Sequence, residues 1–203
     1  MSWTRLKPRY VGGLIEALPH YRTLGCRKLA EGYLAMLGNG GGSIPEKNQL
    51  DLAEFAAAIP HMALVAVTRP DQCIYRLAGE RLKERVGFNV KGRNYYDFVP
   101  PERRQFAARA MHMVIETPCA FRAEIRQTYS GGVDLIIEAT GFPLLSREPG
   151  VDGFILFADQ AIEPDMAFYD AHPQLQGANV IRRDLIDLGA GIDETFEDMV
   201  QTA

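Results

Sequence analysis

The sequence predicts an α+β fold built on a five-stranded antiparallel sheet. Five short segments rich in apolar residues are separated by turns that contain glycine or proline, and helical stretches lie before and between them. Segments 62–67 and 154–157 are apolar on both alternating faces, which is typical of central strands. Segment 121–128 alternates apolar and charged residues and therefore lies farther from the centre. These patterns predict the sheet order 2-1-5-4-3, with helices on one face, an N-terminal helical arm and a C-terminal helical tail.

The arm comprises residues 1–42. Its apolar residues between 14 and 37 recur at helical spacing, with an interruption near Pro19, and the glycine-rich run 37–45 ends the pattern. After this run a short helix is expected over 51–58, and a proline stops it before the first strand.

The central domain comprises residues 43–160. Its first two strands form a hairpin, and a short helix ended by Gly87 follows them. A longer amphipathic helix leads to a second hairpin, whose strands flank a Tyr-Ser-Gly-Gly turn. In chain order, the expected elements are strands 62–67 and 73–77, helices 80–86 and 101–116, and strands 121–128, 133–142 and 153–159. Because the sheet has a second apolar face, we expect the arm or a second subunit to cover it.

Length and composition are those of an ordinary globular protein. The 203 residues are 47% hydrophobic and 24% charged, and no apolar run approaches the roughly 20 residues that a spanning helix needs. The N terminus lacks the unbroken apolar core of a signal peptide, so we expect a cytoplasmic protein with no membrane partner. The three widely spaced cysteines fit reduced, buried thiols. The net charge is −4 with no clustered basic face, so no nucleic-acid partner is expected.

The two ends of the chain carry opposite charge. Residues 1–30 hold six Lys and Arg against one acid, whereas residues 165–203 hold two Arg against eight acids. This opposition favours pairing between the ends, within one chain or between two, and we expect a homodimer that forms through the arm. The acidic tail, residues 161–203, has apolar residues in a loosely helical arrangement. We interpret it either as a helix that docks on a signalling partner or as a solvated end.

Three stretches of the chain carry its most distinctive sequence. They are SIPEKNQLDLAEFAAAIPHMALVAV (43–67), YRLAGERLKERVGFNVKGRNYYDF (75–98) and GFILFADQ (153–160). These stretches resemble the PAS domain family, in particular a subfamily of short, single-domain bacterial (proteobacterial) PAS proteins of unassigned function. The resemblance spans residues 43–160. It implies a sensory module that binds a small molecule or a protein partner and carries no catalytic residues.

PAS-like folds can hold haem or flavin, so the resemblance requires that each cofactor be tested against the sequence. None of them is predicted. Haem would need an axial ligand, but His112 lies nearly opposite the apolar stripe of its helix and is expected to face solvent. Flavin-adduct domains use a cysteine in the helix that matches 80–86, which contains none. The histidines show no metal-ligand spacing, so no metal site is predicted. An unidentified small ligand is the remaining expectation.

Paired acidic residues provide one alternative to a sensor. Glu124 and Glu138 lie on facing hairpin strands, where we expect them to pair with neighbouring arginines on a solvated face. The alternative is a small-molecule enzyme on a cone-like α+β fold. Its site would require Glu138, Asp134 and His112 to converge in one cavity.

A ligand pocket is expected between the inner face of the sheet and segment 79–98. Its predicted lining is apolar and comprises Leu77, Leu82, Val86, Tyr95, Phe98, Phe106, Ala110, Ile125 and Leu135. Four arginines around this segment are candidate contacts for an anionic ligand, since guanidinium groups bind carboxylates, and the alternative is a solvated helix face. They are Arg76, Arg81, Arg85 and Arg93.

The sequence therefore predicts a cytoplasmic, non-catalytic sensory or interaction module. It would bind a small molecule or a protein, dimerise through its arm and signal through a protein partner. No catalytic residue is assigned.

Overall fold

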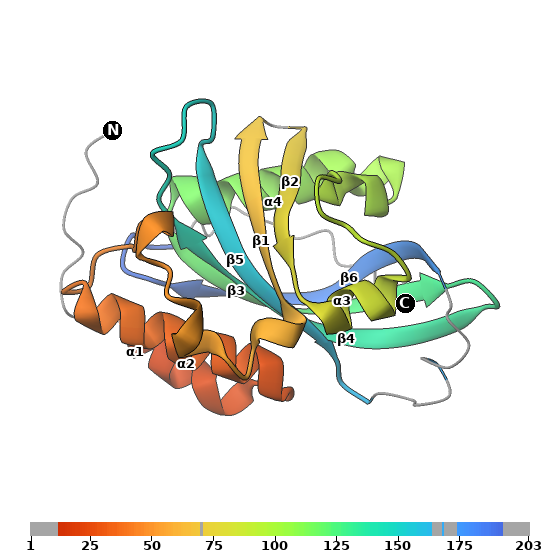
Figure 1. Cartoon of the computed structure of the whole chain (residues 1–203), viewed down its shortest axis with the longest axis horizontal. Helices are drawn as coiled ribbons and strands as arrows, with labels where there is room; N and C mark the ends of the chain where they lie inside the picture. Colours follow the sequence, from red (N-terminus) through yellow and green to blue (C-terminus); the bar gives the residue numbers. More distant parts are fainter. Residues whose placement is uncertain (1–11, 70, 164–167, 169–173, 193–203) are drawn as a thin grey trace.

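The computed structural model describes residues 12–69, 71–163, 168 and 174–192. At its centre lies a twisted, antiparallel six-stranded sheet with the order β2-β1-β5-β4-β3-β6 (Figure 1). The strands are β1 (Met62–Arg69), β2 (Gln72–Ala78), β3 (Cys119–Tyr129), β4 (Val133–Leu144), β5 (Gly153–Ala161) and β6 (Leu175–Asp187). The α-helices are α1 (Gly12–Ala17), α2 (Leu24–Asn39), α3 (Glu80–Val86) and α4 (Arg104–Glu116). The 3-10 helices are η2 (Leu18–His20), η3 (Lys47–Gln49), η4 (Leu52–Phe55), η5 (Ile59–His61), η6 (Tyr95–Phe98) and η7 (Pro101–Arg103).

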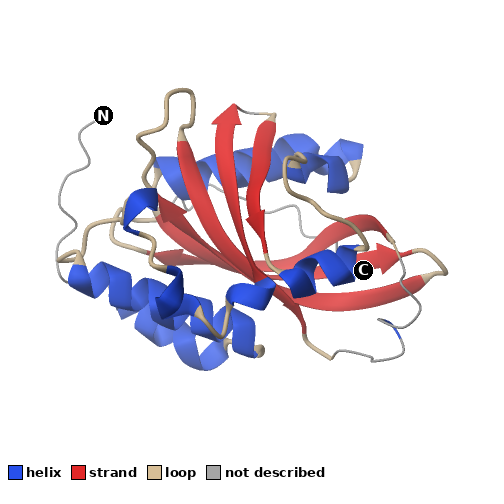
Figure 2. Cartoon of the chain, in the orientation of Figure 1, coloured by secondary structure: helices blue, strands red, loops and turns tan. Residues whose placement is uncertain are grey.

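Helices cover both faces of the sheet (Figure 2). We call the face under α3 and α4 the inner face, and the face under α1 and α2 the outer face. Successive residues of β1 pack into two different cores. Val65 and Val67 pack into the inner core, while Leu64 and Ala66 pack into the outer one. Strand β5 alternates in the same way. Both strands are therefore buried on two sides, and their predicted central position is confirmed.

The arm supplies the cover of the outer face. Leu29, Tyr33 and Leu37 follow one another along one side of α2 and are buried. The ring of Tyr33 stacks on Phe142 of β4 at a centroid distance of 4.6 Å, and its hydroxyl donates to the Pro143 carbonyl at 2.7 Å. A second subunit is therefore not needed to bury this face.

The expectation of a helical tail is wrong at residues 175–187, which form β6. This strand pairs with β3 and extends the predicted order 2-1-5-4-3, which is otherwise confirmed, by one strand. Two register shifts in the pairing place five β6 residues opposite the inward-facing residues of β3: Leu175, Ala178, Val180, Arg183 and Leu185. The prediction of a helix rested on the apolar residues from Leu185 onward, and the two register shifts interrupt the strand alternation of β6. Residues 193–203 of the predicted tail lie outside the described part of the chain.

The other elements lie close to their predicted positions. In place of the helix expected over 51–58, the structure has the shorter η4 followed by a turn, and η5 lies after the predicted range. All three cysteines are buried and unpaired, as expected. Within the described residues, no helix is long and apolar enough to cross a membrane.

Candidate functional site

A cavity lies between the inner face of the sheet and segment 79–98, which contains α3, η6 and the loop between them. We call this segment the helical wall. The cavity has a volume of about 50 Å³ and is lined by side chains from the helical wall, from α4 and from five strands, β2 to β6. Most of these side chains are aliphatic or aromatic. Gln127 and Asp159 are the polar exceptions, apart from tyrosine hydroxyls.

Glycines and backbone hydrogen bonds fix the helical wall against the sheet. At Gly79 an added Cβ would lie 2.2 Å from the carbonyl oxygen of Ile59, so this approach requires glycine. Gly92 adopts a φ of +83°, in the region that favours glycine. Its N–H donates to the Tyr75 carbonyl at 2.8 Å, and the Tyr75 N–H donates to the Arg93 carbonyl at 3.0 Å. The loop therefore pairs with the edge of β2 and closes the cavity on that side.

A buried polar cluster of Arg85, Gln127, Tyr129 and Asp159 adjoins the cavity. Arg85 is only 2% exposed, and its Nη2 lies 2.6 Å from Asp159 Oδ1. Its Nη1 donates to Gln127 Oε1 and, at 3.3 Å, to the Tyr129 hydroxyl. Tyr129 donates to the same Gln127 oxygen at 2.6 Å. Since Gln127 and Asp159 line the cavity and Arg85 does not, the guanidinium lies behind them.

The charge of Arg85 is balanced inside the cluster. Burial by itself would lower the pKa of the guanidinium, but the neighbouring Asp159 carboxylate and Tyr129 outweigh it and raise this pKa above its ordinary value. Arg85 therefore stays charged. The pair is short, yet within the described residues neither Arg85 Nη2 nor Asp159 Oδ1 has an aligned hydrogen bond.

Aromatic rings form much of the remaining lining. The ring centroid of Tyr75 lies 5.9 Å from that of Phe157 and 6.3 Å from those of Tyr95 and Phe98. Burial raises the pKa of the Tyr95 hydroxyl to about 12, so this group is neutral at physiological pH. Tyr95 and Ile125 also line two smaller cavities, of about 30 and 20 Å³. These two side chains are therefore shared by three adjoining spaces.

The structure brings most of the predicted pocket residues to this region. Those that line the cavity are Leu82, Val86, Tyr95, Phe98 and Ile125. Phe106 and Ala110, both on α4, each line one of the smaller cavities. Leu135 is buried in the inner core but does not line any of the three spaces.

Leu77 is the prediction that the structure contradicts, because its side chain is 44% exposed. A register shift between β1 and β2 pairs Tyr75 with Val65 but Leu77 with Leu64, so Arg76 has no partner in the pairing. Leu64 faces the outer core. Leu77 is therefore turned away from the cavity.

The four candidate anion-binding arginines do not converge on one site. Arg76, Arg81 and Arg93 are exposed on the surface. Arg85 is the exception, because it is buried and reaches the wall of the cavity. Its charge is already paired with Asp159, so an anion would have to displace that carboxylate.

Gln127 and Asp159 are the polar lining residues that the sequence reasoning missed. Asp159 ends the buried apolar run 154–158, and an acidic residue in so apolar a strand is a signal that could have identified it. Gln127 alternates with charged residues on β3, which conceals its inward direction.

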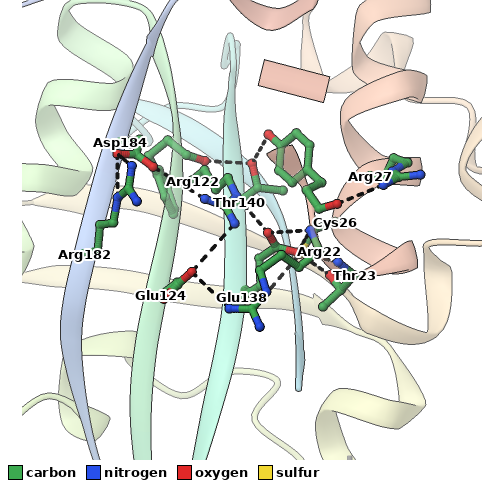
Figure 3. A network of polar contacts seen from close by, with 12 residues as sticks. Arg22, Thr23, Cys26, Arg27, Arg122, Glu124, Glu138, Thr140, Arg182 and Asp184 are labelled. Atoms are coloured by element: carbon green, nitrogen blue, oxygen red, sulfur yellow. Dashed lines mark hydrogen bonds and ion pairs between the residues drawn. The ribbon is translucent and has the colours of Figure 1, made fainter. Parts of the chain in front are cut away.

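A second buried network joins the arm to the outer face of the sheet (Figure 3). Glu138 on β4 is fully buried, and its carboxylate accepts hydrogen bonds from the N–H groups of Arg22 and Thr23 at 3.0 and 2.7 Å. It also accepts from the Thr23 hydroxyl at 2.7 Å and from Arg122 Nε at 2.7 Å. The expected pairing with an arginine is confirmed, but the expected solvated face is wrong, because the start of α2 covers it.

The residues required by the enzyme alternative do not meet. Glu138 lies beneath the arm, and Asp134 is exposed at the hairpin between β3 and β4. His112 lies on α4, across the sheet from Glu138, and does not line the inner cavity. Its side chain is 15% exposed, so the expectation that it faces solvent is wrong. Among the described residues, no group of three or more His, Cys, Asp or Glu could hold a metal ion.

Comparison with known proteins gives one family match. The family model described as "PAS domain" matches residues 32–154 of the chain. No curated protein matches the chain significantly.

Three solved structures align with parts of this chain. The PAS-B domain of Drosophila melanogaster Cycle with bound glycerol is 10% identical, with a TM-score of 0.38, over 50% of this chain and 98% of that chain. A fungal LOV domain photoreceptor is 17% identical, with a TM-score of 0.41, over 63% of this chain and 88% of that chain. The Vibrio cholera VqmA–ligand–DNA complex is 19% identical, with a TM-score of 0.36, over 56% of this chain and 52% of that chain.

Proposed function

Since this chain belongs to the PAS domain family, we propose that it is a non-catalytic sensory module that binds a small molecule in its inner cavity and signals through a protein partner. Domains of this kind are sensory modules that bind ligands or partners. Binding of a small molecule at this particular place is supported by the local structure of the cavity.

The observation that carries the proposal is a buried ion pair beside an aromatic cavity. A buried charge does not increase the stability of an apolar core. Polar groups placed in an apolar lining are typical of sites that orient a ligand. Arg85 and Asp159 are both buried and lie 2.6 Å apart, and Asp159 lines the cavity. Such an arrangement is a candidate for recognition rather than for packing alone.

Neighbouring residues of β5 connect the cavity to the arm. Asp159 lines the cavity, while the next residue, Gln160, faces the arm and accepts a hydrogen bond from the Gly25 N–H of α2 at 2.8 Å. On β4, Ala139 lines the cavity and the adjacent Glu138 binds the start of α2. A ligand that displaces Asp159 would therefore also disturb the supports of α2. We propose that the arm is the element that transmits ligand binding to the rest of the signalling system.

The arm is also the proposed interface with a second copy of the chain. Ile15 on α1 and Leu24 on α2 are 53% and 60% exposed, which supports a contact through this surface. Buried, unpaired thiols fit a reducing compartment and favour a cytoplasmic location. The three sequence stretches described above favour the bacterial branch of the family.

Native mass spectrometry of the purified full chain, combined with its absorption spectrum, tests the proposal. We expect a small molecule to be carried or taken up at one per subunit, and to be released on unfolding. Leu82→Phe should abolish this binding, because Leu82 is buried and lines the cavity. Leu77→Phe is the matched control, since that side chain is exposed. Binding that persists equally in Leu82→Phe, or a chain that takes up no small molecule, would contradict the proposed function.

A further inference from the structure

We infer that the inner cavity selects a neutral molecule with a largely apolar body and a hydrogen-bond donor that meets the Asp159 carboxylate. This inference rests on the proposed function and names the class of ligand for the same cavity. It replaces the anionic ligand that the arginines around the helical wall led us to expect.

The polar part of the wall presents an acceptor. Asp159 Oδ1 lies 2.6 Å from Arg85 Nη2, and the Asp159 carboxylate forms part of the cavity lining. The Asp159 side chain keeps 11% of its surface exposed and lines the cavity. An ionised carboxylate only accepts hydrogen bonds. The ligand group that faces it must therefore donate one, as a hydroxyl or an N–H group does.

A negative ligand is disfavoured at this place. An anion placed against Asp159 would meet the carboxylate before the Arg85 guanidinium, which lies behind Asp159 and Gln127. Arg183 lines the two smaller cavities but does not line this one. Like charges repel strongly in a poorly solvated interior.

A positive ligand is disfavoured for a different reason. Asp159 is already balanced by Arg85, so a cation would lose its hydration without gaining an unpaired counter-charge. A neutral donor avoids both costs.

The aromatic lining determines the shape and polarity of the rest of the ligand. Tyr75, Phe98 and Phe157 line the space with aromatic rings, which suit an apolar body that contains a ring. The cavity of about 50 Å³ is smaller than the roughly 150 Å³ that hold benzene in an engineered core. A ligand with one ring therefore requires a side chain to move.

Tyr95 is the side chain that we expect to move. It lines all three cavities, so its displacement would join the main space to the two smaller ones. Within the described residues its hydroxyl makes no hydrogen bond, and its ring makes contacts with Tyr75 and Tyr96 at 6.3 and 5.7 Å. Rotation would therefore break ring contacts and no hydrogen bond.

Four one-ring compounds test the inference on the full chain by protein-detected NMR titration. Phenol offers a neutral donor, anisole and toluene offer none, and benzoate is an anion of similar size. We expect phenol to bind at least tenfold more tightly than each of the other three, with shifts confined to the cavity. Benzoate or anisole binding as tightly as phenol would overturn the inference.

A double variant assigns the preference to Asp159. Arg85→Met combined with Asp159→Leu removes both charges together, and such replacements of a buried pair by apolar residues preserve folding in other proteins. The phenol-to-anisole affinity ratio should fall close to one. The matched control removes the exposed pair on the same helix, Arg81→Ala with Glu84→Ala, and should keep the wild-type ratio. A preference for phenol that survives in the first double variant would refute the role of Asp159.

The outcomes also separate the inference from the function on which it rests. If the compounds bind in the cavity without a preference for the donor, the ligand class is wrong and the proposed function stands. If none of the four compounds shifts cavity resonances at millimolar concentration, the inferred ligand class is wrong, and the proposed function is decided by native mass spectrometry. The ranking in the wild-type chain decides the question even if a variant does not fold.

Discussion

Replacing Glu138 with alanine removes the carboxylate that joins the arm to the sheet. Four hydrogen-bond donors would lose their acceptor: the N–H groups of Arg22 and Thr23, the Thr23 hydroxyl and Arg122 Nε. Breaking a buried ion pair by removing one partner costs about 3–5 kcal/mol. Each further hydrogen bond to the charged group contributes about 1.5–3 kcal/mol, although such values do not add within one network. We therefore expect Glu138→Ala to lower the free energy of unfolding by at least about 3 kcal/mol.

Urea unfolding and hydrogen exchange together test this reasoning. Global stability is measured from the unfolding midpoint, and exchange at the start of α2 reports whether the arm has detached from the sheet. Glu124→Ala is the matched control, because Glu124 meets Arg22 and Arg122 only in ion pairs of 3.5 and 3.8 Å. The control should cost at most about 1 kcal/mol. A loss below 1 kcal/mol in Glu138→Ala, or unchanged exchange in α2, would refute the role that we assign to this network.

Three further predictions follow from single positions. Burial lowers the pKa of His61 below its ordinary value of 6.5, so the unfolded chain binds the proton more tightly than the folded one. Stability should therefore fall as the pH drops below 6.5, and less steeply in His61→Gln, when unfolding is compared between pH 7.5 and 5.5. Gly79→Ala should cost about 1–3 kcal/mol in urea unfolding, because its Cβ would meet a backbone carbonyl, whereas Gly177→Ala, in open space, should cost under about 0.5 kcal/mol. Asp159→Ala should lower stability by about 3–5 kcal/mol in the same assay, because it leaves the buried Arg85 guanidinium uncompensated; a loss near zero would mean that the pair is not buried as described.

Much of the sheet could be predicted because its pattern is local. Strands buried on both faces, such as β1, read as continuous apolar runs, and this alone fixes their central place. Strand β6 could not be found in this way, because two register shifts interrupt its alternation. Leu77 was misplaced for the same reason, since one irregularity in the β1–β2 pairing turns it outward.

The candidate site was harder to predict because its polar part depends on contacts across the fold. The apolar lining from Leu82 to Phe98 follows from helical spacing and from the glycines that punctuate the helical wall. The partners of Arg85 lie on β3 and β5, more than 40 residues away along the chain. No local pattern shows that this arginine is buried while Arg81, one turn earlier, is exposed.

The central claim is that the inner cavity is a ligand site, and methyl NMR during a phenol titration tests it most directly. We predict saturable shifts for the methyl groups of Leu82, Val86 and Ile125, which line the cavity, and none for Leu77, which is exposed. Shifts that do not saturate, or that are as large at Leu77 as in the cavity, would contradict the account.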